Sequence, residues 1–144
     1  MGKQSERSSE PVKGSYVLVV RVEKAMQVNV GALGTMAFEP GFYAYVGSAM
    51  TGLRKRVQRH LGTKKKLFWH IDYLLEHAEV IEVLQVESPK KLECDLATRL
   101  SKELSSVPRF GCSDCKCPSH LFYHGDLQVV RACVAASGTS KRFG

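Results

Sequence analysis

The stretch Tyr16-Val-Leu-Val-Val-Arg-Val22 decides the fold class of this chain. It is short and dominated by β-branched residues, which favours a strand over a helix. We therefore expect it to lie centrally in a sheet, and the neighbouring segments are interpreted around it.

The residues that follow predict further strands. Gln27–Val30 and Thr35–Phe38 flank the segment Gly31–Gly34, which indicates a hairpin around a glycine-bearing loop. Pro40-Gly41 ends this hairpin before another strand over Phe42–Val46.

The second half of the chain predicts three more strands. One is expected over Val80–Val86. A terminal hairpin is expected from Leu121–His124 and Leu127–Val134, joined by a turn at Gly125-Asp126. Cys133 would then be a core residue of the last strand.

The first change to helical spacing follows Gly52. Leu53, Val57 and Leu61 recur every four residues, which predicts a helix. The same spacing places Arg56 and His60 together on another face of that helix.

Two further helices are predicted. Apolar residues from Leu67 to Ala78 follow helical spacing. Ser88-Pro89 provides an N-cap and a first-position proline for a third helix, whose buried stripe runs from Leu92 to Leu104 with Glu93 in its first turn. The fold class is thus α+β: a small, mainly antiparallel sheet flanked by helices, with an extra N-terminal β-hairpin.

The length of 144 residues suits one domain with short tails. We expect a polar tail over residues 1–12, one domain over 13–136 and a basic tail over 137–144. No apolar run reaches the roughly 20 residues of a membrane span, and the polar N-terminus lacks a secretion signal, so we expect a cytoplasmic protein without membrane partners. The net charge of +7 favours polyanionic partners.

Five cysteines in a chain without an export signal favour thiols or metal ligands over disulfides. Cys112, Cys115, Cys117 and His120 supply enough ligands for one tetrahedral, structural zinc ion, although not at a standard finger spacing. Cys94 could replace Cys112 if the third helix packs there. The alternative is that these thiols are free or partly buried.

Several short blocks, in this order, resemble the GIY-YIG endonuclease family. Gly14-Ser15-Tyr16 opens a strand, Tyr45-Val46-Gly47 ends a later one, and Leu53-Arg54-Lys55-Arg56-Val57 lies in the following helix. Further blocks are similar to those of the Uri superfamily branch, formerly a domain of unknown function: His70–Leu75, Glu93–Ala97, Phe110–Cys115 and Ser119–Phe122.

The resemblance implies a GIY-YIG-like nuclease domain that hydrolyses phosphodiesters with one bound Mg²⁺ or Mn²⁺. It assigns Tyr16 and Tyr45 to the two motif tyrosines, Arg56 to the helix arginine, His60 to the position one turn later, and Glu93 to the metal ligand. These residue types suit the chemistry, because the reaction needs a base, a cation for the developing charge and a metal that polarises oxygen.

Two features depart from the family pattern. About 29 residues separate Tyr16 from Tyr45, and the surplus is the predicted Gln27–Phe38 hairpin, which is expected to alter substrate choice. Ser48 stands where many family members carry a lysine, which removes a phosphate contact or a charge that lowers a tyrosine pKa.

The leading hypothesis is a metal-dependent DNA endonuclease, with branched or damaged DNA among its candidate substrates. A non-catalytic nucleic-acid-binding module on the same scaffold, with or without zinc, is the alternative that Ser48 favours. A third hypothesis is a thiol or metal sensor that uses the Cys112–His120 loop. The sequence predicts no particular oligomeric state.

Overall fold

A computed structural model describes residues 12–62, 67, 69–111, 117, 119–137 and 142–143. Its main sheet is antiparallel at each pairing between described strands. The strand order is β6 (Ser105–Ser106), β7 (Leu121–His124), β4 (Gly41–Ala49), β1 (Gly14–Val22), β5 (Glu79–Glu87) and β8 (Arg142–Phe143).

The central position predicted for the first strand is confirmed. β1 pairs with β4 on one side and β5 on the other, and it is buried along nearly its whole length. Alternate residues of β1 enter different cores: Tyr16 and Leu18 join one cluster, whereas Val17 and Val19 join the other. The sheet therefore has a core on each face.

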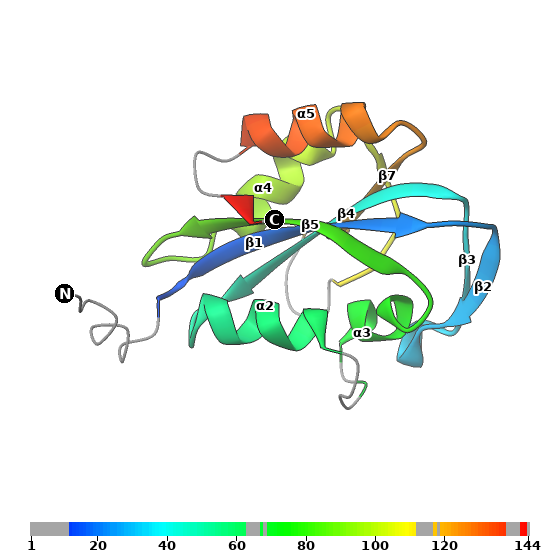
Figure 1. Cartoon of the computed structure of the whole chain (residues 1–144), viewed down its shortest axis with the longest axis horizontal. Helices are drawn as coiled ribbons and strands as arrows, with labels where there is room; N and C mark the ends of the chain where they lie inside the picture. The colour runs from blue at the N-terminus through cyan, green and yellow to red at the C-terminus, as the bar shows by residue number, and fades with distance from the viewer. Residues whose placement is uncertain are drawn as a thin grey trace.

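Helices cover both faces of the sheet (Figure 1). Helices α2 (Leu53–Leu61) and α3 (His70–Leu75) lie on the face that carries Tyr16. Helices α4 (Glu93–Leu100) and α5 (Leu127–Ser137) cover the opposite face. This arrangement confirms the predicted α+β class.

The predicted extra hairpin is also present. β2 (Met26–Asn29) pairs with β3 (Thr35–Phe38) in a separate two-stranded sheet. A 3-10 turn, η1 (Gly31–Leu33), joins them. Phe38 packs edge-on to Tyr43 and Phe110, which ties the hairpin to the core beneath α3.

The prediction of a strand over Leu127–Val134 is wrong, because these residues form helix α5. Val130 and Val134 are buried at helical spacing while Ala132 is exposed. Asp126 starts the helix, since its side chain accepts a hydrogen bond from the amide of Gln128. Cys133 accordingly lies on a helix, where it is half-buried against the second core.

Two other helices are shorter than predicted. The side chain of Ser88 accepts a bond from the amide of Lys90, which closes a turn rather than a helix, and α4 starts only at Glu93. Leu104 is buried beyond its end. Helix α3 starts after Trp69, whose amide donates to the Asp72 carboxylate.

The predicted C-terminal tail contains Arg142 and Phe143, which pair as β8 with the edge of β5. Ser137, its first residue, ends α5. The predicted N-terminal tail over residues 1–12 lies outside the described residues except for Val12, whose carbonyl accepts the amide of Leu53. None of the described helices has the length and apolar character needed to cross a membrane.

Candidate active site

A cavity of about 370 Å³ opens at the end of β1 and β4 that faces α2. It brings together four of the five residues that the resemblance singles out: Tyr16 from β1, Tyr45 from β4, Arg56 from α2 and Glu93 from α4. The other lining residues include Gly47, Ser48, Trp69, Lys91, Gly111 and His120.

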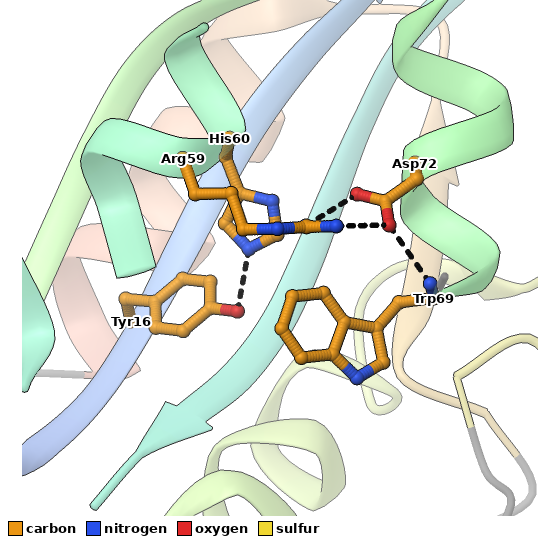
Figure 2. Close-up of polar contacts among 5 residues, drawn as sticks. All are labelled: Tyr16, Arg59, His60, Trp69 and Asp72. Atoms are coloured by element: carbon orange, nitrogen blue, oxygen red, sulfur yellow. Dashed lines mark hydrogen bonds and ion pairs between the residues drawn. The ribbon is translucent and has the colours of Figure 1, made fainter. Parts of the chain in front are cut away.

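The fifth predicted residue, His60, lies directly behind this cavity. Its Nε2 atom shares a hydrogen bond of 2.7 Å with the Tyr16 hydroxyl, as Figure 2 shows. Both side chains are almost fully buried, with 1% and 3% of Tyr16 and His60 exposed. The one-turn spacing of Arg56 and His60 thus places both residues on the side of α2 that faces Tyr16.

Tyr45 lies next to Tyr16 on the same face of the sheet. Their ring centroids are 6.4 Å apart, and Phe110 packs edge-on to Tyr45. Gly111 packs against the Tyr45 ring and has a φ of 78°, a left-handed conformation that favours glycine.

Burial has the largest effect on the pKa of both tyrosines. Removal from water raises the pKa of Tyr16 and of Tyr45 well above the ordinary value of 10.0, and the charge of Glu93 acts in the same direction. The guanidinium of Arg56 opposes both increases without cancelling them. Neither side chain is therefore a phenolate at neutral pH in the unliganded protein.

Arg56 is held in the cavity wall by two contacts. Its Nη1 donates a 2.9 Å hydrogen bond to the carbonyl of Ser48, and its guanidinium lies 4.4 Å from the centre of the Trp69 ring. These contacts fix the position of the charge while the residue still lines the cavity. Its neighbours Arg54 and Lys55 are exposed, as a solvated face of the helix would be.

A buried ion pair supports the tryptophan. Asp72 is fully buried and accepts two hydrogen bonds from Arg59, at 2.8 and 2.9 Å, and a third from the amide of Trp69 (Figure 2). The Arg59 guanidinium also lies 4.3 Å from the centre of the Trp69 ring. Neither Arg59 nor Trp69 could be predicted as part of the site from the sequence, because a pairing across two helices has no signature in the local spacing.

Glu93 is positioned from the strand that carries Tyr16. The Ser15 hydroxyl accepts the amide of Leu92 at 3.0 Å, directly before α4 begins, and Ser48 lies 3.0 Å from the same hydroxyl. Ser15 is fully buried. The first turn of α4 is thereby attached to the paired ends of β1 and β4.

His70 helps to close the other side of the site. Its Nδ1 accepts the amide of Gly111 at 2.8 Å, and its ring packs against Phe110. An accepting nitrogen carries no proton, so the imidazole is neutral in this arrangement. Burial also lowers the pKa of His70 below its ordinary value of 6.5, because removal from water disfavours the charged imidazolium.

We therefore expect the stability to fall with acidification through His70. A histidine whose pKa is lower in the folded protein adds stability above its unfolded pKa, and this stability is lost as the pH falls through the folded pKa. The loss should approach the contribution of the Gly111 bond, about 1 kcal/mol. Urea unfolding of wild type and His70→Asn between pH 7.5 and pH 5 would measure it.

Asn retains an acceptor but cannot gain a proton, so His70→Asn should flatten the pH dependence. His77→Asn, at an exposed histidine, is the matched control and should leave the wild-type slope unchanged. An unchanged slope in His70→Asn would show that His70 does not titrate with folding.

The cysteine loop agrees with the sequence analysis only in part. Cys94, Cys117 and His120 place ligand atoms within 4.8 Å of one another, which makes them candidates to hold a metal ion. Cys112 and Cys115 lie outside the described residues. Cys94 thus joins two of the four predicted ligands.

Comparison with known proteins assigns the chain to a family. A family model described as a domain of unknown function, DUF123, matches residues 15–142. The chain therefore belongs to the DUF123 family. No curated protein and no solved structure gave a match.

Proposed function

We propose that this protein is a metal-dependent DNA endonuclease of the GIY-YIG type that hydrolyses phosphodiester bonds. One observation carries the proposal: Tyr16, Tyr45, Arg56 and Glu93 come from four different elements and line the same cavity. The GIY-YIG resemblance assigned these residues to one reaction on sequence blocks alone, so their convergence supports it.

Arg56 suits the role of the cation that stabilises charge on the phosphate. The Ser48 carbonyl and the Trp69 ring hold its guanidinium in place before substrate binds. A charge that is already oriented needs little reorganisation when the pentavalent transition state forms. A guanidinium also matches the geometry of phosphate oxygens.

Tyr16 and His60 together suit the transfer of a proton from the attacking water. The pKa of Tyr16 is raised by burial, so the hydroxyl is a poor base by itself. His60 lies 2.7 Å away and offers a destination for the hydroxyl proton while Tyr16 accepts one from the attacking water. Such a transfer leaves no phenolate in the buried site.

Glu93 fits the requirement for a divalent cation. It supplies the cavity with the hard oxygen ligand that Mg²⁺ and Mn²⁺ prefer, and Mg²⁺ commonly binds through one carboxylate and retained waters. Asp72 is already bound by Arg59 and Trp69 and lies outside the cavity lining. When bound, the cation would polarise a phosphate oxygen and stabilise the leaving alkoxide.

Basic side chains near the cavity suit a DNA backbone. Lys91 lines the cavity and is exposed, and Arg54 and Lys55 are exposed on α2. Together with the net charge of +7 they favour contact with phosphates on either side of the cleaved bond. Branched and damaged duplexes are the substrates we propose to test first.

Ser48 favours a second candidate function, a non-catalytic nucleic-acid-binding module. Its hydroxyl lies against Ser15, and only its carbonyl reaches Arg56. It therefore adds no charge that would stabilise a phenolate or contact phosphate. A site without that charge could retain DNA binding while cleavage is lost.

Cleavage of labelled DNA tests the two functions. Single-stranded, duplex, flapped, four-way and damaged duplex DNA would be incubated with Mg²⁺, Mn²⁺ or EDTA. We expect cutting that requires the metal and that falls roughly 100-fold in Tyr16→Phe, as is typical when a proton-transfer group is removed. Tyr43→Phe is the matched control, because it also removes a hydroxyl from a buried tyrosine, one that donates to the Glu39 carbonyl.

The two candidates give different results. Metal-dependent cutting that is lost in Tyr16→Phe and kept in Tyr43→Phe supports the nuclease. Salt-dependent DNA binding by folded protein, with no cutting of any substrate under any metal, selects the binding module instead.

A further inference from the structure

The clustering of Cys94, Cys117 and His120 is not explained by the proposed nuclease chemistry. Cys94 lies in the first turn of α4, whereas Cys117 and His120 precede β7. Their ligand atoms nonetheless lie within 4.8 Å of one another. The geometry points to a structural zinc site that joins α4 to the segment before β7.

The protein scaffold fixes the imidazole end of this cluster. The His120 amide donates to the Phe110 carbonyl at 2.9 Å, and the Val46 amide donates to the His120 carbonyl at 2.9 Å. His120 is 2% exposed. The preceding Ser119 is also buried, and its hydroxyl donates to the carbonyl of Val107. The backbone on both sides of this ligand is therefore held by hydrogen bonds to the rest of the fold.

The thiolate from α4 is positioned by a separate set of contacts. Leu92, two residues before Cys94, donates its amide to the buried Ser15 hydroxyl. The Cys94 carbonyl accepts the hydroxyl of Thr98 at 2.8 Å, one turn later. Ligands that approach from two independently anchored segments are typical of metal sites that stabilise tertiary structure.

The donor set selects the type of cation. Two thiolates and one imidazole are soft or borderline ligands, which suit Zn²⁺ and not the Mg²⁺ or Mn²⁺ that Glu93 suits. Tetrahedral bonds of about 2.3 Å to sulfur and about 2.0–2.1 Å to nitrogen place two sulfur atoms roughly 3.8 Å apart and a sulfur and a nitrogen roughly 3.6 Å apart. Ligand atoms within 4.8 Å of one another therefore need to approach by about 1.2 Å at most. The fourth position is left for a further donor or a water molecule.

The proposed zinc site lies next to the cavity that contains Glu93. Cys94 follows Glu93 directly, and His120 lines the same cavity as Glu93. A zinc ion on these ligands would hold the first turn of α4 against the segment before β7. Its role would be to fix this corner of the fold, and its existence does not depend on the nuclease activity.

Metal content of the full-length chain tests this inference. Protein purified under reducing conditions and exposed to zinc should retain one zinc ion per chain after dialysis. Cobalt in place of zinc should give the charge-transfer absorption of thiolate ligands and the visible bands of a tetrahedral site. Cys94→Ser should lose most of the bound zinc and weaken the cobalt absorption.

Cys133→Ser is the matched control, since Cys133 is half-buried on α5 and lies outside the cluster. It should retain zinc and the wild-type cobalt spectrum. Because the cobalt spectrum of the wild-type chain is measured without any substitution, the test holds even if Cys94→Ser folds poorly. None of these measurements uses DNA cleavage.

Three results would overturn the inference. The first is a wild-type chain that retains no zinc and gives no thiolate absorption with cobalt. The second is a folded Cys94→Ser variant that binds zinc as tightly as wild type, which would exclude Cys94 as a ligand. The third is a disulfide between Cys94 and Cys117 that persists in protein purified under reducing conditions, detected by mass spectrometry of peptides prepared without further reductant.

Discussion

Replacing Glu93 by glutamine is expected to lower the rate of metal-dependent cleavage on the order of 100-fold or more. The amide keeps the size of the side chain but removes the negative charge that holds the divalent cation. DNA binding should persist, since Glu93 contributes no positive charge. Single-turnover cleavage at several Mg²⁺ concentrations, beside a binding assay without metal, would measure both effects.

Asp95 provides the matched control for this substitution. It is a second carboxylate in the first turn of α4, but it is exposed and does not line the cavity. Both acids interact favourably with the helix N-terminus, so Asp95→Asn removes a comparable contribution to helix stability. Equal loss of cleavage in the two variants, or none in Glu93→Gln, would contradict the role of Glu93 as metal ligand.

Gly47→Ala should damage the site through the position of Tyr16. Gly47 pairs directly with Tyr16 across β1 and β4, and the tyrosine ring lies over the glycine. A Cβ atom at Gly47 would stand 2.5 Å from the ring carbon that bears the Tyr16 hydroxyl and would also clash with the hydroxyl oxygen. The ring must move, and the hydrogen bond to His60 would be lost with it.

We expect Gly47→Ala to destabilise the protein by about 1–3 kcal/mol, the usual range for overpacking in a core. Cleavage should fall with the displaced hydroxyl, as far as in Tyr16→Phe. Urea unfolding and the cleavage assay would measure the two effects. Gly62→Ala is the control, because a Cβ atom there meets its nearest neighbours at 3.6 Å, an ordinary contact. A fully stable and active Gly47→Ala protein would refute this account.

The sequence predicted the sheet better than the helices that follow it. The strand at Tyr16 was identified correctly because valine-rich segments have few alternatives to a buried strand. The last helix was missed for the same reason. Val129, Val130 and Val134 suggested a strand, whereas the Asp126 cap and the buried spacing of Val130 and Val134 specify α5.

The sequence predicted the residues that line the candidate site but not the residues that hold them in position. Tyr16, Tyr45, Arg56 and Glu93 were named from short blocks, and they line one cavity. The residues that orient them come from distant parts of the chain. Contacts such as Ser15 with Leu92, or Arg59 with Asp72, depend on how helices dock, which no local pattern encodes.

The contribution of Cys94 to the metal cluster illustrates the same limit. Sequence spacing grouped Cys112, Cys115, Cys117 and His120, because they are close along the chain. Cys94 could be offered only on condition that its helix packed against that loop. The packing of α4 beside the segment before β7 meets that condition, and it became visible only in three dimensions.

The adjacency of Ser15 and Tyr16 has a consequence for how the site tolerates variation. Tyr16 faces α2, while Ser15 holds the start of α4 on the opposite face. The half of the site on α2 and the half on α4 are therefore positioned by two consecutive residues of one strand. Of the residues between β5 and α4, Leu92 donates its amide to Ser15 and Lys91 lines the cavity. A change that shifts Leu92 relative to Ser15 would therefore move the glutamate away from the tyrosine.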